Sequence, residues 1–394
     1  MRTFSKYIGK FLSPVIIQKL RESEVVVEVP GQHLNGISGQ PIIKVLDWSF
    51  FTDVFLGYDL GFAESYLRGK WDTADLTALL DCLHKKNLQS PSSKLGNIAP
   101  VKLWAKFIQS IRSSNSLYWA PKNIKDHYDF SDDMFSSFLD PSMTYSAGTF
   151  LGESDTLFDA QSRKLDTILG RVGLKEKDHI LDIGCGWGSL ITKASSNFGC
   201  TATGITLSNN QYSHCTKLTE DLGLEERVLV NFTDYRNMEG TFDHIFAVEM
   251  LEAVGHKGLM EFFYHCDRLL KFGGTIQLQV IVVPHQRYAA YRKSCDFTQK
   301  YIFRVGLLPS SRGIEEAAFN YGFRVIETQS IGNHYVKTLQ HWSKNFEREL
   351  NNLREKGFSE RHLRRFRYYF SYCEVAFASG HIDDLQISLE RLTK

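Results

Sequence analysis

The segment Ile180-Leu-Asp-Ile-Gly-Cys-Gly-Trp-Gly188 decides the fold of this chain. A strand-forming run that carries one carboxylate, Asp182, is followed by three glycines on alternate residues, and a helix-compatible stretch begins at Ser189. Glycines at this spacing let the backbone turn sharply and leave space where side chains would stand. The segment predicts a strand–turn–helix unit with room for a ligand at the carboxyl end of the strand, where open α/β sheets bind ligands.

The spacing of the glycines indicates which ligand this is. G-x-G-x-G differs from G-x-G-x-x-G, which holds the pyrophosphate of a dinucleotide. Without a phosphate to bind, the simplest ligand is S-adenosylmethionine (SAM), whose methionine part can use backbone groups at the strand end. A purely structural turn is the alternative for the glycine cluster taken alone, and the segments that follow decide between the two.

Two polar segments extend the expected ligand site. The strand-like run 200–205 ends in 206–211, which offers hydroxyls and amides about 20 residues after the glycines, where such folds contact a ribose. The run 228–232 ends in 233–236, where Asp234 supplies a carboxylate for an amino group and its neighbour an aromatic face for an adenine. Both segments favour a nucleoside ligand that carries an amino group.

Two further strand-like runs continue the alternation with helical segments. They lie at 242–250 and 275–283, and a turn is expected at 269–274 just before the second of them. Strands that alternate with helices at this rhythm predict a doubly wound parallel sheet. Together with the ligand site, this pattern indicates a SAM-dependent methyltransferase.

The composition sets bounds on the rest. A chain of 394 residues is long enough for two domains. A formal net charge of +1 gives no general affinity for nucleic acid. Seven cysteines without a C-x-x-C pair favour a reducing compartment over a disulfide scaffold. The histidines show no metal-ligand spacing, so no metal site is expected, and no apolar run approaches the length of a membrane span.

The first 21 residues have the pattern of a basic amphipathic helix, in which no acid precedes Glu22. The interrupted apolar pattern is not typical of a signal peptide. Such a helix can lie in a membrane interface, where anionic lipids add about 1 kcal/mol per basic residue. The alternative is a helix that docks on its own domain with its lysines in water. The apolar members are Phe4, Tyr7, Ile8, Phe11, Leu12, Val15, Ile16 and Leu20, and the basic ones are Arg2, Lys6, Lys10, Lys19 and Arg21.

Composition divides the chain into three parts. Residues 1–87 are expected to form a lipid- or membrane-associating domain, residues 88–123 a linker with a connecting helix, and residues 124–394 the methyltransferase domain. An insertion at 284–312 is dense in aromatic and basic residues, which suits a cover over a long apolar substrate. A packed helical cap without a ligand explains this composition equally well. The candidate substrate contacts are Tyr288, Tyr291, Tyr301 and Phe303.

A longer set of motifs resembles one enzyme family. The segment 127–146 (His-Tyr-Asp-Phe-Ser-Asp-Asp-Met-Phe-Ser-Ser-Phe-Leu-Asp-Pro-Ser-Met-Thr-Tyr-Ser) and the glycine segment together resemble the cyclopropane-fatty-acyl-phospholipid synthases. These enzymes use SAM to modify cis double bonds in the acyl chains of membrane phospholipids, and related mycobacterial enzymes modify mycolic acids. The resemblance covers residues 47–390 and includes the motifs at 204–211, 234–236 and 251–255.

The resemblance implies a fold and a set of SAM contacts. The fold is α/β, with a doubly wound, mostly parallel seven-stranded sheet of the SAM-methyltransferase Rossmann-like type, a smaller N-terminal α+β domain and a helical substrate-covering insertion. The contacts agree with the residue-level interpretation of the strand ends. The combined SAM-binding candidates are Tyr145, Ser146, Asp182, Gly184, Gly186, Thr206, Leu207, Gln211, Asp234, Tyr235 and Arg236.

The resemblance also implies a catalytic base. In the family, methyl transfer leaves a carbocation on the acyl chain, and a bicarbonate ion held by a cysteine, a glutamate, a histidine, a tyrosine and backbone removes a proton. The glutamate and tyrosine positions are Glu252 and Tyr335 in this chain, but the cysteine position is Ala147 and the histidine position is Gln279. Glutamine can donate a hydrogen bond to an anion, whereas alanine cannot. The candidate catalytic residues are therefore Glu252, Tyr335 and Gln279, with bicarbonate as a possible second cofactor.

The altered base site leaves the product open. If bicarbonate binds, loss of a proton from the new methyl group closes a cyclopropane ring, which is the first expectation. Otherwise the cation can lose a proton elsewhere and leave a methylene- or methyl-branched chain. A branch of the family with Glu-Ala-Val-Gly, as at 252–255, is similar to this sequence, and some relatives make methyl-branched lipids. A soluble small-molecule acceptor and a catalytically inactive lipid-binding protein are the remaining alternatives.

The expected partners follow from the same interpretation. They are membrane phospholipids with unsaturated acyl chains and an anionic membrane surface, with no nucleic acid. Synthases of this type are often dimers, so a homodimer is compatible with the resemblance. The expected location is cytoplasmic, at the inner face of the membrane.

Overall fold

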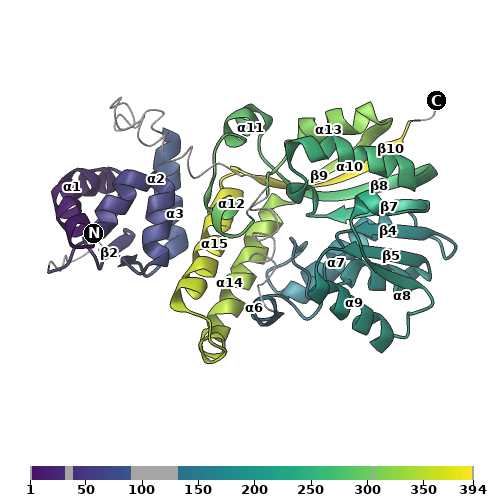
Figure 1. Cartoon of the computed structure of the whole chain (residues 1–394), viewed down its shortest axis with the longest axis horizontal. Helices are drawn as coiled ribbons and strands as arrows, with labels where there is room; N and C mark the ends of the chain where they lie inside the picture. The colour runs from purple at the N-terminus through teal and green to yellow at the C-terminus, as the bar shows by residue number, and fades with distance from the viewer. Residues whose placement is uncertain (1, 32–38, 90–131, 304–305, 393–394) are drawn as a thin grey trace. The chain divides into compact units, whose positions relative to one another are not determined.

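The computed structural model describes residues 2–31, 39–89, 132–303 and 306–392 (Figure 1). The predicted linker at 88–123 lies outside these residues except for its first two positions, which end a helix. The chain divides into two compact units, and each includes segments that are distant in sequence. The first unit comprises residues 1–126, 295–302 and 350–375, and the second comprises 127–294, 303–349 and 376–394.

The first unit is an α+β arrangement around a buried aromatic core. Its small sheet has the order β1-β2-β3, with β1 and β2 parallel and β2 and β3 antiparallel. The indole of Trp71 is fully buried, lies 4.4 Å from the ring of Phe62 and donates a hydrogen bond to the carbonyl of Phe62 at 3.1 Å. The N-terminal elements are α1 (Arg2–Glu22), β1 (Val26–Glu28), β2 (Ile42–Val45), α2 (Ser49–Leu67), β3 (Trp71–Asp72) and α3 (Leu76–Gln89).

Segments from the second half of the chain complete the first unit. They include α12 (Phe297–Tyr301) and most of α15 (Glu360–Ala378). The guanidinium of Arg364 on α15 donates to the carboxylate of Asp72 at 2.7 Å and to the carbonyl of Tyr66 at 3.1 Å. A division of the chain by sequence position alone therefore cannot describe this unit, because its contacts join residues about three hundred positions apart.

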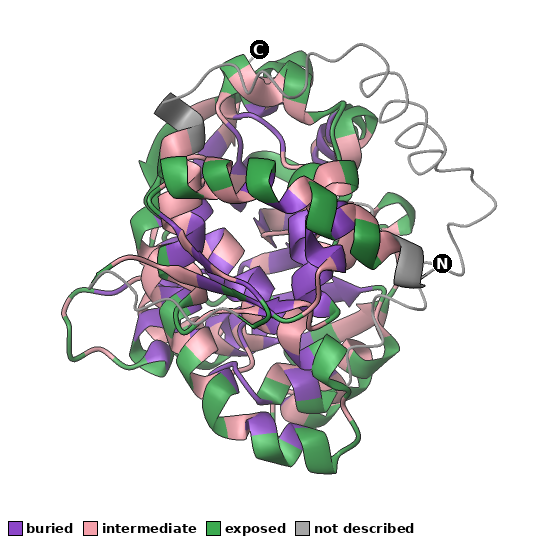
Figure 2. Ribbon diagram, turned by 90° about the vertical axis from the view of Figure 1, so that its left-hand side faces the viewer, coloured by how far each residue is buried: buried purple, intermediate pink, exposed green. Residues whose placement is uncertain are grey.

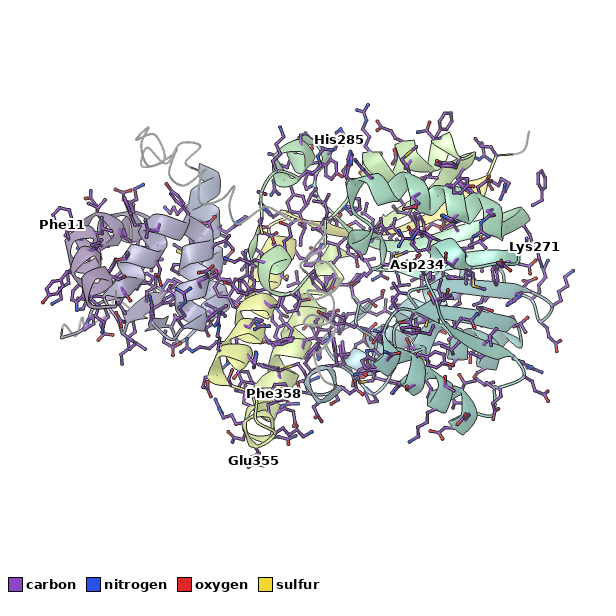
Figure 3. All side chains as sticks on the ribbon, viewed as in Figure 1. Phe11, Asp234, Lys271, His285, Glu355 and Phe358 are labelled. Atoms are coloured by element: carbon purple, nitrogen blue, oxygen red, sulfur yellow. The ribbon has the colours of Figure 1, made fainter. Side chains whose placement is uncertain are left out.

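The N-terminal segment is the helix that its periodicity predicts, and it has one packed face and one exposed face. The packed face lies on α2: a Cβ atom at Gly9 would stand 1.9 Å from the carbonyl oxygen of Trp48. On the exposed face, Tyr7, Phe11 and Val15 are 70%, 84% and 49% exposed. Phe11 projects outward from α1 in Figure 3. The helix docks on its own unit and also presents apolar side chains to solvent.

The second unit contains the predicted doubly wound sheet. Its strand order is β6-β5-β4-β7-β8-β10-β9, all parallel except β10, which is antiparallel to both neighbours. This confirms the expected fold class. The strands are β4 (His179–Ile183), β5 (Thr201–Thr206), β6 (Val228–Phe232), β7 (Phe242–Val248), β8 (Leu270–Val282), β9 (Phe323–Ser330) and β10 (Asp383–Arg391).

Helices cover both faces of this sheet (Figure 1). The long helix α14 begins in the second unit and ends in the first. The helical elements are α6 (Asp132–Ser136), α7 (Leu157–Gly170), α8 (Ser189–Phe198), α9 (Asn209–Asp221), η2 (Tyr235–Asn237), η3 (Leu251–Ala253), α10 (Gly255–Leu269), α11 (His285–Tyr291), α13 (Ser311–Asn320) and α14 (Gly332–Glu355).

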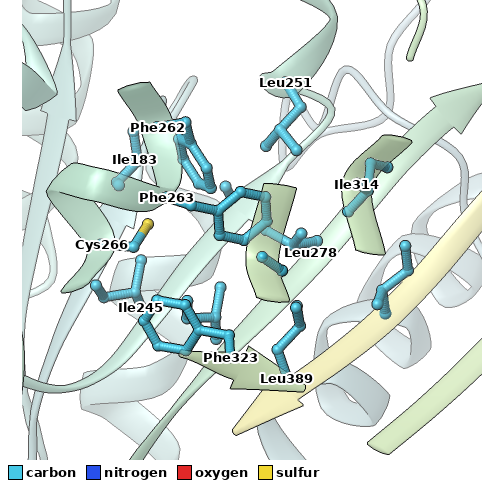
Figure 4. Close-up of a cluster of buried hydrophobic side chains, with 14 of the residues drawn as sticks. Ile183, Ile245, Leu251, Phe262, Phe263, Cys266, Leu278, Ile314, Phe323 and Leu389 are labelled. Atoms are coloured by element: carbon cyan, nitrogen blue, oxygen red, sulfur yellow. The ribbon is translucent and has the colours of Figure 1, made fainter. Parts of the chain in front are cut away.

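Alternate residues of the central strands enter two different apolar cores. Leu181 and Ile183 pack with residues of α10 and α13, in the cluster drawn in Figure 4, whereas Ile180 packs with residues of α7 and α8. Successive side chains of a strand point to opposite faces, and a parallel sheet is normally covered on both. Buried residues, purple in Figure 2, accordingly lie inside these layers. The two cores fix the sheet and so the position of its carboxyl edge.

One predicted boundary is wrong. The turn expected at 269–274 is part of β8, which begins at Leu270 rather than at Thr275. The pairing with β7 shifts register in this region, and Gly273 has a φ of 79°. Gly273 and Gly274 therefore lie at an irregular point within β8 and not in a loop before it, and glycine often marks such irregularities in strands.

Candidate active site

The glycine segment forms the tight turn that its sequence predicts. Gly184, Gly186 and Gly188 have φ values of 80°, 55° and 90°, a region that other residues rarely adopt. The backbone N–H groups of Gly184 and Cys185 both donate to the carbonyl of Ile205 at 3.0 Å. The turn is therefore tied to the end of the neighbouring strand β5.

The turn also leaves the space that a ligand needs. A Cβ atom at Gly186 would meet nothing within 4 Å, whereas one at Gly184 would stand 2.9 Å from the side chain of Met250. Asp182, at the end of β4, is buried, and among the described residues its Oδ1 has no hydrogen-bond partner. Burial raises the pKa of Asp182 to about 7, and the charge of Lys164 opposes this shift. An open backbone beside an unsatisfied buried carboxyl oxygen fits a ligand with hydrogen-bond donors.

The ends of β5 and β6 supply the other predicted contacts. The hydroxyl of Thr206 donates to the side chain of Gln211 at 2.7 Å, and Leu207 between them is 60% exposed. After β6, the guanidinium of Arg236 forms two hydrogen bonds with the carboxylate of Asp234, at 2.8 and 2.7 Å.

These residues follow β4, β5 and β6, which are adjacent strands, so the structure brings the strand-end candidates together at one edge of the sheet. Tyr235 lies between them and α10, with its ring 5.8 Å from the ring of Phe262. Hydroxyl, amide and carboxylate groups around an open glycine turn fit the ribose and amino groups of SAM. Asp182, Gly184, Gly186, Thr206 and the 234–236 segment are the residues that would hold it.

Tyr145 and Ser146 lie in an aromatic and polar surround. The ring of Tyr145 lies 5.2 Å from the rings of both Phe135 and Trp342, and 6.4 Å from that of Phe303. The hydroxyl of Ser146 accepts a hydrogen bond from the buried ammonium group of Lys164 at 2.8 Å. Ser146 therefore points toward a charged cluster while Tyr145 belongs to an aromatic wall.

Glu249 lies at the centre of that charged cluster. It is the first residue after β7, and its Oε1 accepts hydrogen bonds from the backbone N–H of Ala147 and from the side-chain amide of Gln279, each at 2.9 Å. Its Oε2 accepts one from the hydroxyl of Tyr335 at 2.7 Å. Both oxygens of a buried carboxylate are thus satisfied by donors from three separate segments, a feature that the sequence did not reveal.

Two more buried carboxyl groups adjoin Glu249. Glu252 Oε1 accepts from the backbone N–H of Ile281 at 2.6 Å, and its Oε2 has no partner among the described residues. Burial, together with the negative charge of Glu249, raises the pKa of Glu252 to about 8. Burial and the charges of both glutamates hold the pKa of Asp384 well above its usual range. Burial therefore favours the neutral form of both Glu252 and Asp384.

A single buried lysine balances the cluster. Lys164 is fully buried on α7, and burial lowers the pKa of its ammonium group to about 8 against the opposing charges of Glu249 and Asp384. Burial raises the pKa of Glu249, but its hydrogen bonds with Ala147 and Tyr335 and the charge of Lys164 oppose the shift. Glu249, whose carboxylate accepts from three donors, and Lys164 are therefore the two groups of this site whose charged forms are favoured.

Gln279 has a fixed orientation within the cluster. Its Oε1 accepts a hydrogen bond from the side chain of Gln386 at 3.2 Å, so its Nε2 faces Glu249 and donates also to Asp384 at 3.0 Å. An amide with one end bound to a donor presents its other end as a donor. Gln279 therefore positions two carboxyl groups.

The residues do not fit bicarbonate. The donors that the resemblance would assign to that anion, Tyr335 and Gln279, already bind the carboxylate of Glu249. Ala147 offers only its backbone N–H, and this group binds Glu249 too. A second anion would have to displace a buried carboxylate and share its charge.

The four candidate substrate residues are divided between the two units, and each is described by its own surroundings. Tyr288 donates to or accepts from the ring of His256 at 2.8 Å, and Tyr291 ends α11 half-buried. Tyr301 belongs to the first unit, where burial and the carboxylate of Glu64 raise the pKa of its hydroxyl above the usual range. Phe303 joins the aromatic wall near Tyr145.

The sequence interpretation missed Glu249, Lys164 and Asp384. One local signal for Glu249 exists, namely its place directly after a strand and three residues before Glu252. The contacts of Lys164 and Asp384 join α7 and β10 to the edge of the sheet, and no local pattern reports them.

Fold and site together define a class, the SAM-dependent methyltransferases. Comparison with known proteins then identifies the family. The family model described as mycolic acid cyclopropane synthetase matches residues 116–387, and the chain belongs to that family. It is a SAM-dependent methyltransferase that acts on lipids.

Individual relatives agree with this family. The chain is 34% identical over 345 residues to the tuberculostearic acid methyltransferase UfaA1 of Mycobacterium tuberculosis, an alignment covering 84% of this chain and 79% of that protein. It is 33% identical to a probable fatty acid methyltransferase of Pseudomonas putida, over 67% of this chain and 68% of the relative. The solved structure of the mycolic acid cyclopropane synthase CmaA1 complexed with SAH and CTAB matches with a TM-score of 0.64 and 32% identity, covering 68% of this chain and 98% of that one.

Two structural findings concern metals and membranes. Within the described ranges, no group of three or more histidine, cysteine, aspartate or glutamate residues could hold a metal ion. Within the same ranges, no helix is both long enough and apolar enough to cross a membrane.

The open space at Gly186 generates a prediction about SAM binding. Gly186→Ala adds a methyl group that meets no protein atom, so the protein should fold with a left-handed strain of ~1–2 kcal/mol. The methyl group would stand where SAM is expected, and the affinity for SAM should fall at least about tenfold, which corresponds to ~1.4 kcal/mol. Gly173→Ala is the matched control, because Gly173 has a φ of 58° and equally open space in a distant turn. Calorimetric titration with SAM compares the two, and equal affinities would contradict the assigned SAM position.

The raised pKa of Glu252 generates a prediction about stability. A carboxyl group whose folded-state pKa is about 8, against 4.5 ordinarily, stabilises the fold fully below pH 4.5, and this contribution is lost as the pH rises to about 8. Glu252→Gln stays neutral throughout and can still accept from Ile281. The free energy of unfolding of the wild type should therefore fall relative to this variant between pH 5 and 8, by an amount on the order of a few kcal/mol. Thermal unfolding of the ligand-free proteins measures this difference, and parallel pH profiles would refute the buried neutral carboxyl.

Proposed function

We propose that this protein transfers the methyl group of SAM to a carbon of a cis double bond in the unsaturated acyl chains of phospholipids. The observation that carries the proposal is a continuous aromatic wall that leads to a buried carboxylate. The rings of Tyr145 and Trp342 lie 5.2 Å apart, those of Trp342 and Tyr335 lie 5.9 Å apart, and the hydroxyl of Tyr335 binds Glu249. Tyr145, the first residue of this wall, and its neighbour Ser146 are both SAM-binding candidates.

The chemistry of an alkene explains why such a wall is useful. SAM supplies an electrophilic methyl group, and an unactivated alkene is a poor nucleophile for it. Holding the two reactants in a dry, oriented pocket can contribute ~7–11 kcal/mol to lowering the barrier. Methylation leaves a carbocation on the acyl chain, and the faces of Tyr145 and Trp342 can stabilise a nearby cation through their ring quadrupoles. The carboxylate of Glu249 adds a full negative charge at the end of the wall.

The relatives support a fatty acyl acceptor more than a soluble one. Two of them are named for methylation of fatty acids, and one solved relative is named for cyclopropane formation on mycolic acids. These names include both methyl transfer and cyclopropane formation. The proposed reaction therefore ends either in a cyclopropane ring or in a methylene- or methyl-branched chain. An inactive lipid-binding protein is disfavoured, because the SAM-binding candidates and the carboxylate cluster share one edge of the sheet.

We also propose that α1 brings the protein to an anionic membrane surface from the cytoplasmic side. Tyr7, Phe11 and Val15 are exposed on one side of the helix, and Lys10 lies beside them over the ring of Trp48. Among the residues before Glu22, the charged side chains are all basic. Exposed aromatic groups flanked by lysines suit the interface between acyl chains and anionic headgroups.

The proposed reaction predicts a specific labelling pattern. Vesicles of a phospholipid with one cis double bond per acyl chain, incubated with the protein and SAM labelled at the methyl group, should gain one labelled CH₂ per modified chain. Vesicles of the saturated lipid should gain none, because methylation needs the alkene. Mass spectrometry measures the gain, and proton NMR distinguishes cyclopropane from olefinic products. Label in a water-soluble acceptor, or none in lipid, would contradict the proposal.

The proposed membrane contact predicts an effect of the exposed face alone. Tyr7→Ser combined with Phe11→Ser should weaken binding to vesicles that contain phosphatidylglycerol by about tenfold or more, because two large apolar side chains no longer enter the interface. Affinity for SAM should stay unchanged. Phe272→Ser combined with Phe319→Ser is the matched control, since these residues are 79% and 69% exposed in the second unit. Equal vesicle binding by the two double variants would leave α1 as a docked helix only.

A further inference from the structure

The carboxylate of Glu249 is held as a catalytic base would be held. Three of its hydrogen-bond donors are a backbone N–H, an amide and a phenol, at 2.9, 2.9 and 2.7 Å, and the side chain of Asp384 also forms a hydrogen bond with it. None of these donors carries a charge that would neutralise the carboxylate by a direct ion pair. Lys164, the nearest cation of the cluster, binds Ser146 instead. Among the residues that the structure describes, the carboxylate of Glu249 is thus oriented by hydrogen bonds and takes part in no salt bridge.

The backbone at this position is specialised as well. Glu249 has a φ of 50°, and only three other described non-glycine residues have positive φ, namely Glu24, Tyr58 and Met143. A side chain larger than glycine rarely adopts this region, and where it does the strain often serves a functional site. The strain places the carboxylate of Glu249 between the strand end and Tyr335 on α14.

The other two acids of the cluster are less suited to accept a proton. Glu252 has a single backbone donor on Oε1, and burial raises its pKa to about 8. Burial and the two glutamates also hold the pKa of Asp384 well above its usual range. Burial thus favours the neutral form of Glu252 and of Asp384, whereas the three donors on the carboxylate of Glu249 favour its ionised form.

We infer that the side chain of Glu249 is the base that completes the reaction, so that this enzyme needs no bicarbonate. The inference rests on the proposed methylation of an acyl alkene. After methylation, a C–H bond breaks either in the new methyl group, which closes the ring, or on a carbon next to the cationic carbon, which gives an alkene. Its electron pair forms either the last bond of a cyclopropane ring or a new C=C bond, and its proton passes to a carboxylate oxygen of Glu249. The neutral carboxylic acid then returns the proton to water before the next turnover.

The same contacts explain the altered residues of the site. A free anion is held in the site by hydrogen-bond donors, whereas the carboxylate of Glu249 is covalently attached to the chain. Gln279 suffices because it only has to orient Glu249 and Asp384, and Ala147 suffices because its backbone N–H is the group that is used. Ala147 and Gln279 at the family's cysteine and histidine positions, together with the presence of Glu249, are therefore parts of a single change.

Binding of bicarbonate provides a test that needs no turnover. We would add ¹³C-labelled bicarbonate to the full-length protein saturated with S-adenosylhomocysteine and follow its NMR line width. The wild type should show no saturable binding. Glu249→Gly removes the carboxylate and suits the positive φ, so this variant should bind bicarbonate in the space left between Ala147 and Tyr335. Glu24→Gly is the matched control, because Glu24 has a φ of 59° in the first unit. It should behave as the wild type does.

Turnover on vesicles of the cis-unsaturated phospholipid provides the second test. Removal of bicarbonate from the buffer should leave the wild-type rate unchanged. Glu249→Gln should lower the rate by about 100-fold or more, the usual contribution of a general base, while affinity for SAM is retained. Glu249→Gly should be equally slow without bicarbonate and should recover when bicarbonate is added, which a merely structural role would not produce.

The outcomes separate the base from the proposed function. Saturable bicarbonate binding by the wild type, or a wild-type rate that falls without bicarbonate, would overturn the role of Glu249. So would a Glu249→Gln variant that retains its rate. A wild type that methylates no lipid would refute the proposed function, and the bicarbonate titration would still decide whether Glu249 takes the place of the anion.

Discussion

The burial of three carboxyl groups beside one lysine is the constraint on which this site depends. Ionised groups are costly to bury without partners, so the cluster can hold few charges. Lys164 provides one positive charge. Of the three acids, Glu249 is the one whose two oxygens both accept hydrogen bonds, and Glu252 and Asp384 each accept fewer. The hydrogen bonds thus decide which acid is ionised. The three acids of the cluster and an aromatic wall then lie together at one edge of the sheet.

The doubly wound sheet is what assembles this cluster. Glu249 follows β7, Gln279 lies on β8 and Asp384 on β10, and these three strands are consecutive in the sheet although they are far apart along the chain. The antiparallel direction of β10 brings Asp384, near the start of that strand, to the edge where β7 and β8 end. α14 adds Tyr335 and α7 adds Lys164. The SAM-binding candidates occupy the same edge on β4, β5 and β6, so donor and base are neighbours by topology.

The sequence predicts the donor half of the site better than the base half, for a physical reason. The glycine turn and the polar strand ends at Thr206 and Asp234 are local patterns, which can be recognised in a single sequence. Glu249 stands inside an apolar run, and its meaning lies in contacts with Gln279 and Tyr335 that only the folded chain creates. The periodicity of α1 predicts a helix but cannot decide between docking and exposure, because the helix has a face of each kind. The glycines before Thr275 were misassigned because an irregular strand and a turn share the same residues.

A side chain of the protein itself, and not a bound anion, is thus proposed to occupy the base position. A high-resolution crystal structure with S-adenosylhomocysteine, from crystals grown in bicarbonate, tests this most directly. We expect density for the Glu249 carboxylate within hydrogen-bond distance of the Ala147 N–H and the Tyr335 hydroxyl, with no separate anion between them. A planar, three-oxygen anion bound to Tyr335 and Gln279, with Glu249 turned away, would contradict it.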